Sequence, residues 1–175
     1  TFLRPGVDGV LVPIANQTAD FSHSAEIKKR RVPLVLFDRA NDSLGVPSVV
    51  VDDFAGAYKA VQHLREQGCK RIAHISGPQH VAIFGQRLKG YTDALADAGI
   101  PIRNEYITEG GISIESGKRC MQQLLALETP PDGVFAVEDF TALGAMQAIK
   151  EAGLRIPQEV ALIGFANEAF GAFIT

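Results

Sequence analysis

Short apolar runs alternate along the chain with stretches in which apolar side chains recur every three or four residues. Several of the short runs are continuously apolar, which is typical of strands covered by helices on both faces of a parallel sheet. We therefore predict strands at residues 10–13, 34–37, 48–51, 71–76, 105–108, 133–137 and 160–165.

Between these strands, four apolar stripes have helical spacing, and each is followed by a glycine or a proline that can end a helix. The stripes are Ala57, Ala60, Val61 and Leu64 before Gly68; Leu88, Tyr91, Leu95 and Ala98 before Gly99; Cys120, Leu124 and Leu127 before Pro130; and Ala145, Ile149 and Ala152 before Gly153. Strands that alternate with helices through short connections predict right-handed βαβ units and an open, Rossmann-like parallel sheet.

The predicted elements divide unevenly between two parts of the chain. Residues 71–165 hold four strands and three intervening helices, which is enough for one doubly wound subdomain. Residues 1–51 supply three strands and one recognisable helix, which is too little for a second complete sheet of that kind. We interpret the chain as an internal fragment: part of an N-terminal lobe at 1–51, and most of a C-terminal lobe at 52–175. Asp52 and Asp53 mark the expected crossover.

Composition and charge indicate an ordinary soluble globular protein, with 46% apolar and 21% charged residues. The net charge of −3 does not favour nucleic acid, and the basic cluster at residues 28–31 fits the end of a predicted helix, where cations complement the helix dipole. Cys69 and Cys120 lie far apart without metal-ligand spacing, so we expect free thiols in a reducing cytoplasm. No signal-peptide pattern or membrane-length apolar run is present in the sequence given.

The motifs of common catalytic and cofactor sites are missing from the sequence. The segment from Gly111 to Lys118 fails the spacing of a phosphate-binding loop, and neither a dinucleotide fingerprint nor a nucleophile elbow occurs. The four histidines show no metal-binding spacing, and we interpret His74 as a core or edge residue of a strand. The sequence therefore predicts no enzyme, no cofactor and no metal.

Polar and distinctive residues follow six of the predicted strands at their carboxyl ends. In open α/β sheets that edge is where ligands bind. The residues are Asn16 and Gln17; Asp38, Arg39 and Asn41; Phe84, Gln86 and Arg87; Gly111 and Ile112; Glu138 and Asp139; and Ala166, Asn167 and Glu168.

Several of these residues also have purely structural interpretations. Asp139 is placed to N-cap a helix beginning near Phe140, Asp52 or Asp53 can cap another, and Arg39 can be a solvated loop cation. Arg87 is expected in the first turn of a helix, where the helix dipole disfavours a cation. We therefore interpret Arg87 as a ligand contact.

Five segments carry a resemblance to a known family. They are 7–12; 51–68, from the crossover through Gly68; 75–91, from Ile75-Ser76-Gly77-Pro78 to Arg87-Leu88-Lys89-Gly90-Tyr91; 110–117; and 144–165. Taken together, their spacing resembles the effector-binding core of lactose-repressor-type (LacI/GalR) transcription regulators. The resemblance implies a two-lobed fold like that of periplasmic sugar-binding proteins.

The same resemblance implies roles for individual residues. Arg87 would hold effector hydroxyls or carboxylates, Ile112 would supply an apolar wall, and Glu138 stands where many sugar-responsive members carry Asn. Ala166 stands where the family commonly has an Asp, so Asn167 or Glu168 could compensate. The predicted ligand-binding set is Asp38, Arg39, Phe84, Arg87, Ile112, Glu138 and Asn167.

By this resemblance the chain is expected to be the effector module of a cytoplasmic, dimeric regulator. A small polar metabolite, carbohydrate-like, would bind between the lobes and control operator DNA binding by a helix-turn-helix domain outside these residues. The alternative is a solute-binding protein for transport or chemotaxis. An enzyme on a flavodoxin-like sheet is the third reading, and no paired acid and base supports it.

Overall fold

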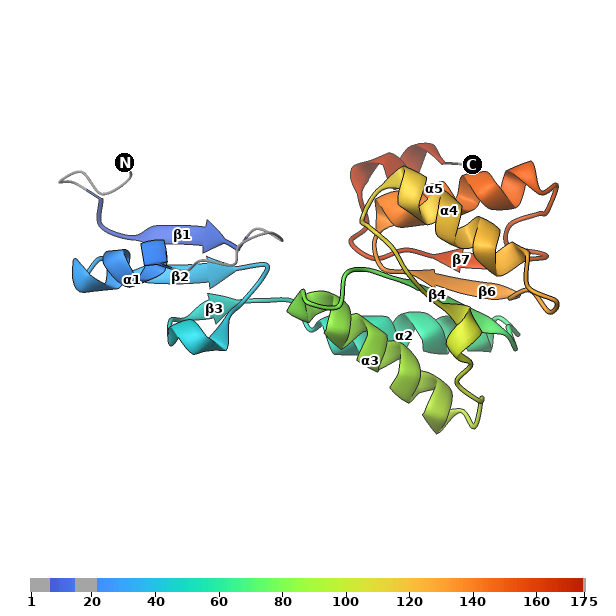
Figure 1. Cartoon of the computed structure of the whole chain (residues 1–175), viewed down its shortest axis with the longest axis horizontal. Coiled ribbons are helices and arrows are strands. Elements are labelled where there is room, and N and C mark those ends of the chain that lie inside the picture. The colour runs from blue at the N-terminus through green and yellow to red at the C-terminus, as the bar shows by residue number, and fades with distance from the viewer. Residues whose placement is uncertain (1–6, 15–21, 175) are drawn as a thin grey trace. The chain divides into compact units, whose positions relative to one another are not determined.

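The computed structural model describes residues 7–14 and 22–174 of the chain. The chain divides into two compact units, Thr1–Asp52 and Asp53–Thr175, so that the boundary falls between the two adjacent aspartates. Figure 1 shows the helices and strands of both units.

The first unit contains a parallel sheet with strand order β1-β2-β3. Its elements are β1 (Val10–Pro13), α1 (Ser22–Lys29), β2 (Leu34–Phe37) and β3 (Ser48–Val49). Leu34 and Leu36 of β2 are buried. The strand predicted at 48–51 is two residues too long, because the partner strand β2 ends at Phe37, opposite Val49. Val50 and Val51 lie beyond that pairing and are exposed.

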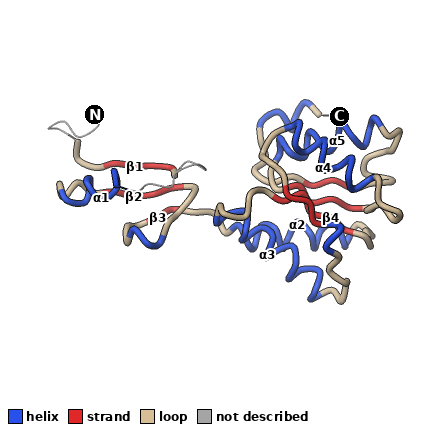
Figure 2. The backbone as a smooth tube through the Cα atoms, in the orientation of Figure 1, coloured by secondary structure: helices blue, strands red, loops and turns tan. Residues whose placement is uncertain are grey.

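The second unit contains a four-stranded parallel sheet with strand order β5-β4-β6-β7. Figure 2 draws the strands in red, with β4 labelled. Its elements are α2 (Asp53–Glu66), β4 (Ile72–Ser76), α3 (Ala82–Asp97), β5 (Ile107–Glu109), α4 (Ile114–Leu125), β6 (Gly133–Ala136), α5 (Asp139–Glu151) and β7 (Ala161–Ile163). Helices α2 and α3 cover one face of the sheet, and α4 and α5 cover the other (Figure 1). This arrangement confirms the predicted open parallel α/β fold.

The predicted β4 and β6 differ from the observed strands by one residue, and the predicted β5 and β7 are wrong by two residues at one end. Residues Asn104–Tyr106 form a 3-10 turn instead of the start of β5, which buries Tyr106 and lets its hydroxyl donate to Thr129 O at 2.9 Å. The last strand is shorter than residues 160–165, because its pairing with β6 ends where Phe135 meets Ile163.

Two apolar clusters cover the two faces of this sheet. One contains Leu124 of α4 and Ile149 of α5, and the other contains Val61 of α2 and Leu95 of α3; all four side chains are at most 2% exposed. Burying a side chain of this size stabilises the folded state by about 1.5–3 kcal/mol. These residues belong to the stripes from which the four helices were predicted.

Helices α4 and α5 approach each other backbone to backbone at two glycines. A Cβ atom added to Gly117 would overlap the carbonyl oxygen of Thr141, and one added to Gly144 would overlap the carbonyl oxygen of Ile114. Both obstacles are backbone atoms, which cannot turn aside as a flexible side chain can. The distance between the two helices therefore depends on the absence of side chains at these positions.

Both cysteines are free and buried, Cys69 at the start of the segment leading to β4 and Cys120 within α4. Burial raises the pKa of the Cys69 thiol above its ordinary value. Across the described residues, every helix is too short or too polar to cross a bilayer.

His74 lies in the core at the centre of β4. Its ring stacks between Tyr91, at 5.1 Å, and Phe135, at 4.7 Å, and Nδ1 lies 2.9 Å from Phe135 O. A carbonyl oxygen can only accept, so the neutral ring carries its proton on Nδ1. Complete burial lowers the pKa of His74 to about 4. The histidine is a core residue, as one of the two sequence interpretations held.

We expect His74 to make the protein less stable in mild acid. Its ordinary pKa is about 6.5, and the folded-state pKa is about 4. The unfolded chain therefore takes up the proton first as the pH falls, and stability is lost between about pH 6.5 and pH 4. From pH 7 to pH 5 this group alone should remove about 2 kcal/mol of the free energy of unfolding. Urea denaturation at the two pH values measures the loss.

The matched variants are His74→Gln and His63→Gln, the second of which changes an exposed residue of α2. His74→Gln should lose about 2 kcal/mol less than the wild type between pH 7 and pH 5, whereas His63→Gln should follow the wild type. Equal losses in all three proteins would show that His74 is not the responsible group.

Candidate functional site

The carboxyl ends of β4, β5, β6 and β7 lie at one edge of the second unit's sheet, because all four strands are parallel. We call these strand ends and the loops that follow them the strand-end edge. Ligands of open α/β sheets bind at this edge. It carries five of the predicted site residues: Phe84, Arg87, Ile112, Glu138 and Asn167.

Arg87 is the most constrained of these residues. Its Nε donates to Asp53 Oδ1 at 2.8 Å, its Nη2 lies 2.7 Å from the same oxygen, and its Nη1 donates to Val137 O at 2.6 Å. The centre of the guanidinium lies 3.7 Å above the ring of Phe165. Both charged side chains are nearly enclosed, with 11% of Arg87 and 7% of Asp53 exposed. Three of the five N–H groups are used in this way, and one on each Nη atom is left.

Arg87 does not lie in the first turn of its helix, where it was predicted. Helix α3 begins at Ala82, so Arg87 lies in the second turn and not in the first. Its charge is also balanced within the unit by Asp53, which the sequence indicated as a helix cap and as part of the crossover. That Arg87 contacts a ligand stays a prediction, now supported by two N–H groups without an assigned partner at the strand-end edge.

Phe84 is buried, with 2% of its surface exposed, and packs with Val81 and Val137. Gly77 lies flat against its ring, because a Cβ atom there would come within 2.8 Å of two ring carbons. In this structure Phe84 supports the loop after β4 and presents little surface to a ligand. Its predicted role as a direct contact stays untested.

The helix cap predicted at Asp139 is made by Glu138 instead. Glu138 is the N-cap of α5, and its carboxylate accepts from Phe140 N at 3.0 Å and from Thr141 N at 2.6 Å. Asp139 instead accepts from the backbone N–H of Glu168 at 2.6 Å, which ties the loop after β7 to the start of α5. A ligand at Glu138 would therefore compete with a helix cap.

Ile112 and Asn167 lie on exposed loops. Ile112 is 37% exposed, in the loop where Gly111 N donates to Ser116 Oγ at 2.7 Å. Asn167 has a left-handed backbone, with φ of 59°, and the preceding Ala166 has φ of 115°. Positive φ is unfavourable at an alanine and marks a constrained loop. Both predicted residues are accessible, and their ligand contacts stay predictions.

The remaining two site residues belong to the first unit. Asp38 follows β2 with a left-handed backbone, and Arg39 donates from Nη1 to Ile14 O at 2.9 Å. Arg39 Nη2 lies 3.7 Å from Asp38 Oδ2, and the side chain is 25% exposed. Arg39 is therefore held by the loop after β1 and is not a freely solvated cation. Asn16 and Gln17 lie outside the described residues.

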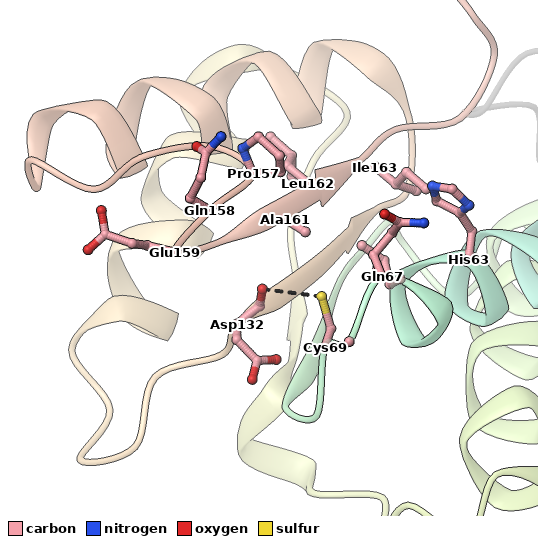
Figure 3. A pocket seen from close by; sticks show the side chains of 12 residues that line it. His63, Gln67, Cys69, Asp132, Pro157, Gln158, Glu159, Ala161, Leu162 and Ile163 are labelled. Atoms are coloured by element: carbon pink, nitrogen blue, oxygen red, sulfur yellow. Dashed lines mark hydrogen bonds between the residues drawn. The ribbon is translucent and has the colours of Figure 1, made fainter.

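A groove of about 450 Å³ lies elsewhere, at the amino ends of the strands (Figure 3). The groove is lined by His63 of α2, by Gln67 just after that helix, and by Cys69, Asp132 and strand β7. The Cys69 thiol donates to Asp132 O at 3.5 Å. Asp132 caps this end by accepting from the backbone N–H groups of Lys70 and Arg71. The groove contains none of the predicted site residues. Among the described residues, no group of three His, Cys, Asp or Glu side chains could hold a metal ion.

Comparison with known proteins agrees with this geometry. Residues 61–175 match the family model of the periplasmic binding protein-like domain. The HTH-type transcriptional repressor CytR of Escherichia coli K12 is 38% identical over 161 residues, which are 92% of this chain and 47% of CytR. A LacI-family regulatory protein of Chloroflexus aggregans superimposes with a TM-score of 0.87 at 31% identity, covering 95% of this chain and 59% of that one.

A second similar structure was solved with a ligand. The transcriptional regulator CelR in complex with cellobiose has a TM-score of 0.77 and 34% identity, over 91% of this chain and 49% of its own. The chain thus contains a periplasmic-binding-protein-like domain and spans about half the length of the curated relatives it matches. It belongs to the LacI family of transcription regulators.

Proposed function

We propose that this chain is the effector-binding part of a bacterial transcription repressor and that it binds a small polar metabolite at the strand-end edge. The observation that carries the proposal is Arg87, an almost enclosed guanidinium with N–H groups left over where ligands of such sheets bind. CytR is a repressor, and CelR was solved with a sugar. Both similarities favour a sensor over the transport alternative.

The whole protein is proposed to act through parts outside these residues. A helix-turn-helix domain would bind operator DNA, and two copies of the chain would form a dimer in the cytoplasm. Effector and operator binding would be coupled, and each would change the affinity for the other by the same factor. We further propose that the protein is not an enzyme, since the strand-end edge offers an arginine and capping carboxylates but no activated nucleophile.

The test begins with a thermal-shift screen of the full-length protein. The panel contains neutral sugars, sugar acids, sugar phosphates and nucleosides. A ligand at about 100 times its dissociation constant should add roughly 2.7 kcal/mol to the free energy of unfolding, which raises the melting temperature by several degrees. Calorimetric titration of any ligand found then gives its affinity. If no compound binds, the proposal fails.

We expect Arg87→Lys to weaken binding of that ligand at least tenfold. Lysine can keep a charge beside Asp53 but cannot reproduce the N–H groups of both Nη atoms. The matched control is Arg103→Lys, which makes the same change before β5, at the amino ends of the strands. Titration calorimetry should give a wild-type affinity for the control, and unchanged affinity in Arg87→Lys would contradict a contact with the ligand.

A further inference from the structure

The charge of Arg87 is matched by one buried partner. Asp53 Oδ1 lies 2.8 Å from Nε and 2.7 Å from Nη2, so that the cation and the carboxylate form a close pair. A pair at this distance presents little net field to a third group, because the two charges nearly cancel. Arg87 can therefore offer N–H groups to a ligand without offering a free positive charge.

The neighbouring strand ends supply no positive charge that could attract an anionic ligand to the pair. The charged side chains after β6 and β7 are acidic: Glu138, Asp139 and Glu168. Another cation near the strand-end edge, Arg119 of α4, is exposed and donates to Ser116 Oγ at 3.2 Å. An anionic ligand would approach carboxylates and an already neutralised guanidinium.

We propose that Asp53 sets the charge class of the effector, so that the site selects an uncharged ligand whose hydroxyl or carbonyl oxygens accept from Arg87. This inference rests on the proposed function and narrows it. Asp53 acts through Arg87 as a positioning residue. Carboxylate- and phosphate-bearing analogues of the same ligand are excluded, because they would need the charge that Asp53 already balances.

The experiment compares matched ligands on the full-length protein by titration calorimetry. The pairs are glucose with glucuronate and with glucose 6-phosphate, galactose with galacturonate, cellobiose with cellobionate, and adenosine with adenosine monophosphate. For the pair that binds, the wild type should prefer the neutral member by tenfold or more. A wild-type preference for the anionic member would overturn the inference and leave the proposed function standing. Failure of every pair to bind would overturn both.

Asp53→Asn tests the assigned residue directly. The amide oxygen can still accept from Arg87 Nε, but the negative charge is gone. The ratio of neutral to anionic affinity should shift by about tenfold toward the anionic member. Circular dichroism checks that each variant is folded. If Asp53→Asn does not fold, the ratio of neutral to anionic affinity in the wild type decides the inference.

The control is Asp97→Asn, which changes the net charge equally. Asp97 is the last residue of α3, ten residues from Arg87 and thus about 15 Å along the helix. It accepts from the hydroxyl of Tyr58 and has no assigned role at the strand-end edge. The control should leave the affinity ratio at its wild-type value. The same ratio in Asp53→Asn and Asp97→Asn would overturn the assignment of Asp53.

Discussion

Replacing Gly144 with alanine should lower the free energy of unfolding by up to about 2 kcal/mol, although alanine is the better helix former. The intrinsic gain is about 1 kcal/mol, but the new methyl group would overlap the backbone carbonyl of Ile114. Helices α4 and α5 would have to move apart, and overpacking of this kind typically costs more than the propensity returns. Urea denaturation monitored by circular dichroism measures the difference.

Gly85 provides the matched control within α3. The nearest atom to a Cβ there is Gln79 Oε1 at 4.0 Å, so Gly85→Ala should raise stability by up to about 1 kcal/mol. Gly117→Ala should resemble Gly144→Ala, because its methyl group would meet Thr141 O from the other helix. Three variants of equal stability would mean that the two helices can separate at little cost.

Replacing Arg87 with alanine should destabilise the protein by about 3–5 kcal/mol, in addition to its effect on ligand binding. The substitution leaves the carboxylate of Asp53 buried without its cation and removes the donor to Val137 O. Chemical denaturation without ligand gives the cost.

A double-mutant cycle with Arg87→Ala and Asp53→Ala measures the interaction energy between the two side chains. If the two side chains interact as their distances indicate, the double variant should lose about 1–3 kcal/mol less than the sum of the single variants. The pair Arg155→Ala and Glu159→Ala is the exposed control, with 71% and 40% of the side chains accessible, and its coupling should be under about 1 kcal/mol. Additive losses at Arg87 and Asp53 would contradict a tight buried pair.

The architecture of the second unit could be predicted because its signals are local. Strand β6 is a continuous apolar run. Helix α2 contains an apolar stripe and is followed by Gly68, whose φ of 94° suits the end of a helix. The errors came where burial depends on a distant partner. Val50 and Val51 have the same β propensity as paired valines, but nothing in their own sequence shows that β2 has already ended at Phe37.

The site was predicted less well, for reasons of backbone geometry and long-range contact. The N-cap of α3 is Val81, which makes no side-chain capping bond, so the sequence carries no signal that the helix starts there. Glu138 and Asp139 are both capable of capping, and the extended backbone of Glu138 decides between them. The partner of Arg87 lies 34 positions away, at Asp53, and no single-sequence pattern connects the two.

The two cysteines have a practical consequence for observing the molecule. Cys69 and Cys120 are 8% and 1% exposed, and thiols with so little accessible surface react slowly with alkylating reagents. A third cysteine placed at an exposed position, such as that of Ala166, can therefore carry a fluorescent dye while both native thiols remain in place. Site-specific labelling of this protein therefore does not require replacement of Cys69 or Cys120.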